Sequence, residues 1–232
     1  MVTAHQPHFL PWMGYFNKLV NSDIFLVQDN VQFRKLYFQN RTFIKNMHGD
    51  KYRLTIPVSF SHSDSIKDVR IANSKWRLSI LRTIEYSYCK APFFDDLWDD
   101  IESVISGKSV YLVDITIPLL QILIETLGLN NLKLCYTSDF GVQGSSTQKL
   151  ILIAEKLGVN RFIFGEGGSL AHHNLDLMKK AGISVVQQSF VDKHPVYPQI
   201  HGNFVSELSV IDSLFNVGFD NTKAMLLKAW KI

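Results

Sequence analysis

The chain has 232 residues, of which 46% are hydrophobic and 12% aromatic, and its net charge is +3. This composition excludes disorder for most of the chain, because disordered segments combine few apolar residues with a high net charge. A chain of this length buries enough surface for one large domain or two small ones. A net charge of +3 gives no overall preference for nucleic acid, so any basic site must be local.

Several features of the sequence bear on its compartment. Cys89 and Cys135 lie among apolar residues in no metal or redox spacing, which predicts buried free thiols in a reducing environment. The first residues contain no basic region followed by an apolar run, so no signal peptide is expected. The apolar stretch 110–129 contains Asp114 and Glu125, which favours a buried helix over a membrane span. We therefore expect a cytoplasmic protein with no membrane span.

The hydrophobic pattern predicts strands and helices along the whole chain. A short strand at 2–4 is followed by a helix at 12–20, and the continuous apolar run 23–28 predicts a strand buried on both faces. Two strands, 42–46 and 51–58, flank a turn and predict a hairpin. The remaining elements are helices from 73 onward, at 95–105 and at 110–127, a strand at 132–136, a helix at 146–157, a strand at 161–164, a helix at 170–180, a strand at 183–188, and helices at 207–216 and 222–230.

The alternation of these elements predicts the fold class. Residues 131–188 read as β-α-β-α-β with short loops, and residues 2–28 read as β-α-β, which indicates a parallel sheet with right-handed crossovers. We therefore expect an α/β protein with a Rossmann-like parallel sheet of about five strands. Residues 30–130 are expected to form an inserted hairpin-plus-helices lid subregion within a single domain of residues 1–232, followed by a helical C-terminal arm.

Ligands of open parallel sheets bind at the carboxyl ends of the strands, so the residues after each predicted strand are candidates for a site. The first strand is followed by residues 5–8, which read His-Gln-Pro-His, and the second by Asp29. The third is followed by residues 137–139, the fourth by 165–169 and the fifth by 187–189, and all of these segments are polar or rich in glycine. The first, second and fourth are the most unusual in composition.

The loop after the first strand combines two histidines, two prolines and several aromatic residues beside a helix start. Pro11 suits the first helical position, and the free N–H groups of a helix start attract anions. His5 or His8 could donate a hydrogen bond to a phosphate or act as an acid–base group near pH 7. The alternative interpretation is a proline-stiffened turn whose histidines only pack or cap.

A second candidate is the basic cluster Arg34, Lys35, Arg41 and Lys45, which is interleaved with aromatic residues. Guanidinium and ammonium groups beside a strand end suit phosphate binding. The same composition also describes a surface for single-stranded nucleic acid, or simply a solvated hairpin face. Asp29, at a strand tip, could hold Mg²⁺ or a ribose hydroxyl.

Two further segments have weaker signals. Residues 165–168 resemble a glycine-rich anion loop that leads into a helix, although they have the spacing of neither the P-loop nor the dinucleotide fingerprint. The stiff segment around Tyr197 and the helix containing Asp212 either line a site or pack as an ordered arm. A structural metal site is not expected, because no cysteine supports the histidines and adjacent histidines on a helix diverge.

These residues resemble the pattern of the WbqC-like family. The family's opening element, His-Gln-Pro-x-x-Leu-Pro-Trp-x-Gly-Tyr-Phe, corresponds to residues 5–16. Its Val-Gln-Phe and Asn-Arg elements correspond to residues 31–33 and 40–41. The fourth loop departs from the family, which often has Ser-Gly where this chain has Phe164-Gly165. Further elements of the pattern match residues 88–94, 195–199 and 208–216.

The resemblance implies an association with surface-polysaccharide (O-antigen) clusters and with nucleotide-activated amino sugars. The leading hypothesis is a group transferase that binds a nucleotide, such as ATP or a nucleotide-sugar, and transfers an acyl or aminoacyl group to an amino sugar. The alternatives are a nucleotidylyltransferase-like enzyme, because such enzymes use His and Gly at this place in a similar fold, and a non-catalytic accessory protein that binds a nucleotide-sugar or RNA.

Candidate site residues follow from these loops and from the family motifs. His5, His8 and Asp29 are the candidate catalytic residues. The candidate ligand is a nucleotide-activated sugar or another phosphorylated small molecule, with or without Mg²⁺. The candidate substrate- or phosphate-binding residues are Gln6, Trp12, Gly14, Lys18, Gln32, Lys35, Asn40, Arg41, Lys45, Gly165, Glu166, Gly167, Gly168, Tyr197, Gln199 and Asp212.

Overall fold

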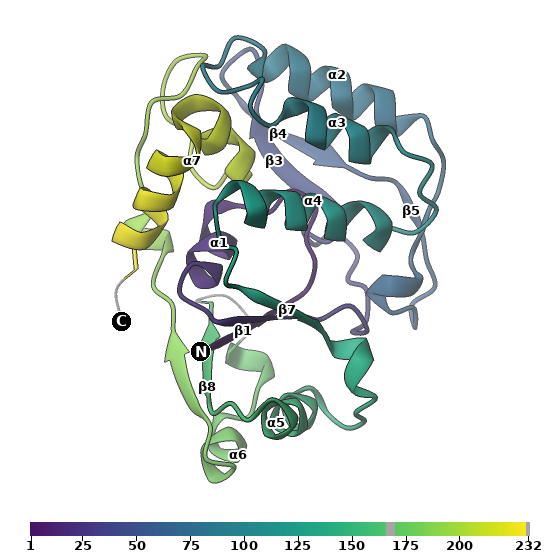
Figure 1. Cartoon of the computed structure of the whole chain (residues 1–232). Coiled ribbons are helices and arrows are strands. Elements are labelled where there is room, and N and C mark those ends of the chain that lie inside the picture. Colours follow the sequence, from purple (N-terminus) through teal and green to yellow (C-terminus); the bar gives the residue numbers. More distant parts are fainter. Residues whose placement is uncertain (166–169, 231–232) are drawn as a thin grey trace.

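A central parallel sheet organises the molecule (Figure 1). The computed structural model describes residues 1–165 and 170–230. The five strands stand in the spatial order β7-β2-β1-β8-β9, which in chain order is the 3-2-1-4-5 arrangement of Rossmann-like sheets, so the predicted fold class is confirmed. The strands are β1 (Val2–His5), β2 (Ile24–Val27), β7 (Lys133–Tyr136), β8 (Arg161–Phe164) and β9 (Ser184–Gln187).

Helices cover both faces of this sheet because its strands are apolar on both sides. Phe25 and Val27 belong to the core on the side of α1 (Met13–Leu19) and α7 (Val210–Lys228). Leu26, between them, belongs to the core on the side of α5 (Ser146–Leu157), where α6 (Leu175–Lys180) also lies. Figure 1 shows α5 and α6 below the sheet and α1 and α7 above it.

The long insertion shares the core of the upper face. Its hairpin pairs β3 (Arg41–Lys45) with β4 (Lys51–Thr55), and a two-residue ladder pairs β5 (Val58–Ser59) with β6 (Arg70–Ile71). Ile84 and Leu119 of the insertion belong to the same buried cluster as Phe25 of the sheet. The insertion is therefore packed onto the sheet, and the division into domains stays a prediction. Its helices are α2 (Trp76–Tyr88), α3 (Trp98–Ser106) and α4 (Val113–Thr126).

Two predicted helices differ in detail. The helix expected at 170–180 is a short 3₁₀ turn (Leu170–His172) followed by α6, because the Asn174 side chain caps the new helix by accepting from the Leu177 N–H. The two helices expected in the tail correspond to the two parts of α7, which is broken at Gly218. Gly218 has φ 77°, and a Cβ there would meet the Phe93 ring at 3.0 Å, so this kink requires glycine.

The expected burial of both cysteines was wrong. Cys89 is exposed, because it follows the last residue of α2 and points away from the core. Cys135 is half-buried, because β7 is an edge strand that pairs only with β2. In the part of the chain that the structure describes, no helix is long and apolar enough to cross a membrane.

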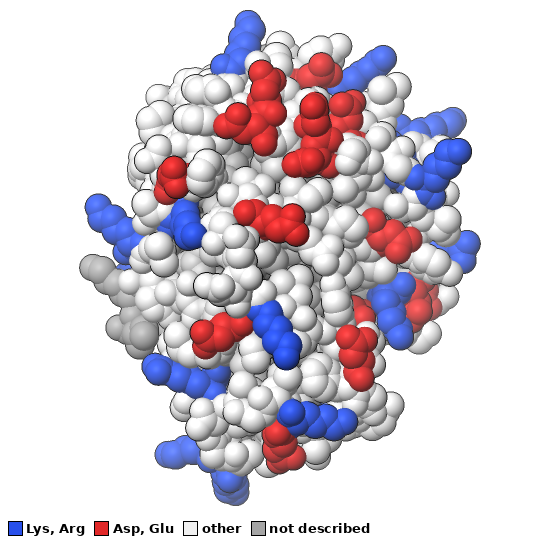
Figure 2. All heavy atoms as spheres, in the orientation of Figure 1, with Lys and Arg blue, Asp and Glu red and all other residues white. Residues whose placement is uncertain are grey.

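Charges are spread over the surface. Figure 2 shows basic and acidic side chains interspersed on one face, with acidic ones gathered near the top, where Figure 1 places α2 and α3. Within the described ranges, ion pairs form only between the Met1 amino group and Asp23 and between Lys51 and Glu207. A local site must therefore come from particular side chains, not from a field over the whole protein.

Candidate functional site at the switch point of the sheet

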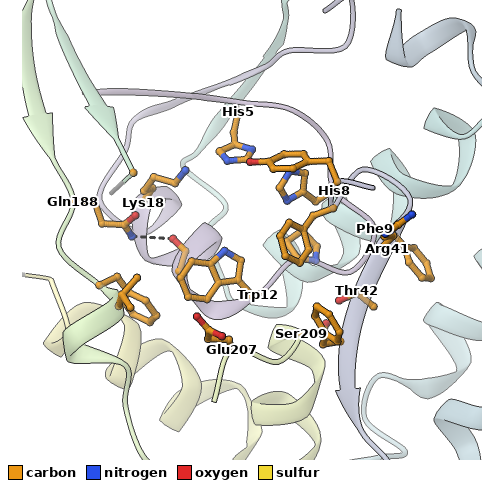
Figure 3. Close-up of a pocket in the computed structure, with 18 of the residues that line it drawn as sticks. His5, His8, Phe9, Trp12, Lys18, Arg41, Thr42, Gln188, Glu207 and Ser209 are labelled. Carbon is orange, nitrogen blue, oxygen red and sulfur yellow. Dashed lines mark hydrogen bonds between the residues drawn. The ribbon is translucent and has the colours of Figure 1, made fainter. Parts of the chain in front are cut away.

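A cavity lies where the strand order of the sheet reverses. β1 stands between β2 and β8, so the loops that follow β1 and β8 diverge and leave a crevice at their carboxyl ends. A cavity of about 300 Å³ occupies this position (Figure 3). It is lined by His5, His8, Phe9, Pro11, Trp12, Gly14, Lys18, Tyr37, Phe38, Arg41, Thr42, Phe43, Lys51, Gly165, Gln188, Phe190, Val191, Glu207 and Ser209.

His5 is the last residue of β1, and its ring is fixed by its own loop. Its Nδ1 lies 3.1 Å from the Gln6 carbonyl oxygen, which also accepts from the Tyr15 hydroxyl at 3.0 Å. A carbonyl only accepts, so Nδ1 carries the hydrogen and Nε2 of the neutral ring keeps its lone pair. Burial, then the charge of Lys18, lower the pKa of His5 well below its usual value. The ring is therefore neutral and offers Nε2 as a hydrogen-bond acceptor.

His8 is buried without a hydrogen-bond partner among the described residues. The side chain is 3% exposed, and both ring nitrogens are unpartnered. Its ring contacts the ring of His5 at 4.6 Å and that of Tyr15 at 5.3 Å between centroids. Burial, then the charge of Lys18, lower its pKa to about 3. Because buried polar atoms in proteins are nearly always hydrogen-bonded, these two nitrogens are candidates for contact with a ligand.

Lys18 supplies a positive charge to the same cluster from the last turn of α1. The residue is 5% exposed, and its Nζ lies 5.6 Å from the centre of the Tyr15 ring. Within residues 1–165 and 170–230, no ion pair forms with its ammonium group. Burial lowers the pKa of Lys18 to about 7. An isolated buried ammonium group is costly, so it favours an anionic partner.

The ends of β8 and β9 complete this part of the cavity. A Cβ on Gly165 would lie 3.6 Å from Lys18 Nζ and 3.5 Å from Gln188 Oε1, so the backbone approaches both groups closely. Gln188 Nε2 donates to the Gly14 carbonyl at 2.8 Å and to Asn17 Oδ1 at 2.6 Å, which ties the end of the last strand to α1. Its position after a predicted strand was the only sequence signal for Gln188.

Trp12 forms one wall of the cavity, and its indole leaves no room for a side chain at Gly14. A Cβ on Gly14 would lie 2.3 Å from an indole carbon of Trp12, so only glycine lets the indole cover the start of α1. The indole contacts Phe190 and His194 of the C-terminal arm at 5.5 and 6.5 Å between ring centres. The start of α1 therefore faces the indole. The cation in the cavity, Lys18, comes from the last turn of this short helix.

The opposite wall comes from the hairpin and the C-terminal arm. Arg41 begins β3, and its buried Nε has no hydrogen-bond partner among the described residues. Burial, then the nearby Arg53, lower its pKa. Lys51 of β4 forms a 3.0 Å ion pair with Glu207 at the mouth. Neither Lys51 nor Glu207 was predicted, because their proximity depends on how the arm returns across the hairpin.

Several predicted site residues lie outside this cavity. Both oxygens of the Asp29 carboxylate accept hydrogen bonds, from the Thr137 hydroxyl and the Ser138 N–H at 3.0 Å each and from the Ser138 hydroxyl at 2.6 Å. These contacts tie the end of β2 to the end of β7. Among the described residues, no group of three or more His, Cys, Asp or Glu side chains could hold a metal ion.

The predicted basic cluster does not converge on the cavity. Only Arg41 lines it, while Lys35 is exposed. Lys45 is fully buried, and its Nζ donates to the carbonyls of Gly202 and Asn203 at 3.3 and 2.6 Å. Strand alternation places Lys45 on the same face as Arg41, but the segment that contains Gly202 and Asn203 covers Lys45 and binds its ammonium group.

The other predicted residues have structural partners. Tyr88, Tyr197 and Gln199 donate to the Asp212 carboxylate at 2.7, 2.9 and 2.8 Å. Burial raises the pKa of Asp212, and these three donors and Lys45 oppose the rise. This network holds the C-terminal arm in place. Outside it, Gln6 accepts from Gln39, Gln32 donates to His62, and Asn40 donates to Ile56, while Glu166, Gly167 and Gly168 lie outside the described residues.

Comparisons with known proteins agree with the resemblance of the motifs. The WbqC-like protein family matches residues 6–224. The uncharacterized protein Rv1507c of Mycobacterium tuberculosis is 24% identical over 220 residues, which cover 94% of each chain. No solved structure matches this chain significantly. Because the family match spans nearly the whole sequence, from the histidine loop to α7, the chain belongs to the WbqC-like protein family.

Proposed function

We propose that the cavity at the switch point binds the phosphate groups of a nucleotide or nucleotide-sugar, and that the protein is a group transferase acting on that ligand. The observation that carries the proposal is the buried Lys18 ammonium beside His5 and His8, with no carboxylate paired to it among the described residues. Nucleotide phosphates bind at this same place in other open α/β sheets. Arg41 supplies a second cation on the facing wall.

An anion would relieve the unfavourable features of this cluster. A phosphate oxygen beside Lys18 would replace the water that burial removes, and it would raise the pKa of the ammonium group from about 7 toward its usual range. The same negative charge would raise the pKa of His8, so that its nitrogens could donate to the phosphate. The binding energy would therefore come from offsetting the cost of burying these groups.

The proposed reaction is transfer of an acyl or aminoacyl group to the amine of an amino sugar, in the synthesis of a surface polysaccharide such as O-antigen. The amine nitrogen attacks the acyl carbonyl carbon, and a C–N bond forms. The bond from that carbon to the leaving group of the acyl donor then breaks, and the leaving group departs with the bonding electron pair. His5 Nε2 takes the proton that the nitrogen loses, since its Nδ1–H is held by the Gln6 carbonyl. The polysaccharide context comes from the family resemblance.

Nucleotidyl transfer is the second candidate. It is favoured by the position of the histidine loop, which leaves the first strand of a 3-2-1-4-5 sheet at the edge of the cavity. In that reaction the sugar phosphate attacks the α-phosphorus of a nucleoside triphosphate, and pyrophosphate leaves. Production of pyrophosphate from ATP or UTP with a sugar phosphate would distinguish it from acyl transfer, in which the nucleotide-sugar keeps its diphosphate.

A ligand screen by thermal shift tests the binding step. UDP- and dTDP-sugars, ATP and pyrophosphate should raise the melting temperature of the wild type. Lys18→Met should lose this shift, whereas the matched control Lys180→Met, at an exposed position of α6, should keep it. If no nucleotide, nucleotide-sugar or pyrophosphate shifts the wild type, the proposal fails.

The catalytic role of His5 is tested separately. His5→Gln should keep the thermal shift and lose turnover of a nucleotide-linked amino sugar with an acyl donor, because the amide cannot accept the proton. Equal turnover in the wild type and the variant would exclude His5 as the base and leave the binding proposal standing.

A further inference from the structure

A loop with an exposed aromatic ring borders the cavity next to His8. Phe38 lines the cavity, and 41% of its surface is exposed. Its ring lies 5.8 Å from that of His8, 5.6 Å from that of Tyr37 and 6.2 Å from that of Phe43, measured between centres. Arg34 lies over the ring of Tyr37 and Lys51 over that of Phe43. Among the described residues, no cation covers Phe38, so its ring can accept a ligand.

This loop is held in place against the histidine loop. Gln39 is fully buried, and its side chain accepts from the Arg34 N–H at 2.9 Å and donates to Gln6 Oε1 at 2.8 Å. The Phe9 N–H donates to the Phe38 carbonyl at 3.1 Å. Leu36 has φ 68°, a left-handed conformation that is unfavourable for leucine. The fold therefore maintains a strained loop that presents an aromatic ring at a cavity.

Ring contacts lead from the buried cation to this aromatic rim. Lys18 Nζ lies 5.6 Å from the Tyr15 ring, the Tyr15 ring 5.3 Å from that of His8, and the His8 ring 5.8 Å from that of Phe38. Figure 3 shows Lys18 and Arg41 on opposite sides of His8. The cavity thus joins the buried Lys18 to an exposed aromatic ring, which matches a ligand with a phosphate group and a planar ring.

We infer that Phe38 is the stacking platform for the nucleobase of a bound nucleotide, whose phosphates point toward Lys18. This inference rests on the proposed function and adds the orientation of the ligand. The face of a phenyl ring stacks on any base, so the subsite selects for a planar heterocycle and not for one particular base. Arg41, which lines the same cavity, adds a second positive charge.

Titration calorimetry with three probes tests the inference. The probes are pyrophosphate, ADP and UDP, and the variant is Phe38→Ala. The variant should bind ADP and UDP about tenfold more weakly and pyrophosphate unchanged, because it removes only the stacking contact. Phe38→Leu, which keeps an apolar side chain, should also weaken the binding of ADP and UDP. Circular dichroism checks that both variants are folded. The matched control is Phe219→Ala, at a half-exposed aromatic residue of α7 outside the cavity, and it should change nothing.

The outcomes separate this inference from the proposed function. If Phe38→Ala leaves ADP and UDP affinity unchanged, or weakens pyrophosphate equally, the stacking subsite is refuted while phosphate binding stands. If the wild type binds none of the three probes, the proposed function fails and this inference fails with it. If oligouridylate binds more than a hundredfold tighter than UDP and depends on Phe38, the loop is an RNA surface, and the nucleobase subsite is overturned.

Discussion

Replacing Lys18 with methionine is expected to stabilise the protein while it removes anion binding. Methionine has a similar length and a high helix propensity, so it can occupy the same space at the end of α1 without a charge. The backbone carbonyl of Lys18, which accepts from the Asn21 N–H and the Ser22 hydroxyl, is kept in the variant. The perturbation is therefore restricted to the buried ammonium group.

The magnitude follows from the pKa of Lys18. Its fall from 10.5 to about 7 on folding corresponds to about 5 kcal/mol, at about 1.36 kcal/mol per pH unit. Between pH 7 and pH 10.5 Lys18 is protonated in the unfolded chain and neutral in the native protein. Its destabilising contribution to the free energy of unfolding is therefore complete below pH 7 and disappears as the pH rises toward 10.5. Lys18→Met should thus increase the free energy of unfolding by up to about 5 kcal/mol at pH 6 and by about 2 kcal/mol at pH 9.

Urea unfolding of the wild type and the variant at pH 6, 7.5 and 9 measures the difference in the free energy of unfolding. Lys180→Met, at an exposed position, serves as the control and should differ from the wild type by less than about 0.5 kcal/mol at every pH. The reasoning is refuted if Lys18→Met is less stable than the wild type at pH 6, or if the difference does not shrink between pH 6 and pH 9.

Three further predictions follow from buried contacts. His8 should make the protein less stable as the pH falls from 6.5 to 3, by up to about 5 kcal/mol, because only the unfolded ring gains a proton in this range. In urea unfolding, His8→Phe should reduce the difference in stability between pH 4.5 and pH 6.5. Gly14→Ala should displace the Trp12 indole, cost about 1–3 kcal/mol and change tryptophan fluorescence; an unchanged spectrum would contradict the packing. Asp212→Ala should cost about 3–5 kcal/mol, because it leaves three donors and the buried Lys45 without the carboxylate; a loss below about 1 kcal/mol in thermal unfolding would show that the network is not structural.

The strand and helix pattern could be predicted because it depends on local sequence. The apolar run at 23–28 and the strand-helix alternation after residue 131 each reflect burial on both faces of a parallel sheet, which leaves a mark on every strand. The boundaries that were missed depend on single side chains. Asn174 starts α6 by capping it, and the non-helical backbone of Gly218 interrupts α7.

Local sequence was enough to predict the fold class and the histidine loop that lines the cavity. His5, His8, Trp12, Gly14 and Lys18 fall in one short segment after the first strand, and strand ends in parallel sheets face a common edge, so their convergence could be expected.

Which of the other candidates line the same cavity depends on long-range packing, which the sequence pattern does not show. Arg41 lines the cavity, whereas the ammonium group of Lys45 donates to the backbone of Asn203. The carboxylate of Asp29 accepts hydrogen bonds from Thr137 and Ser138 instead of facing the cavity. These outcomes depend on contacts between residues far apart in the chain, and on the loss of solvent that isolates the Lys18 charge, which no local pattern encodes.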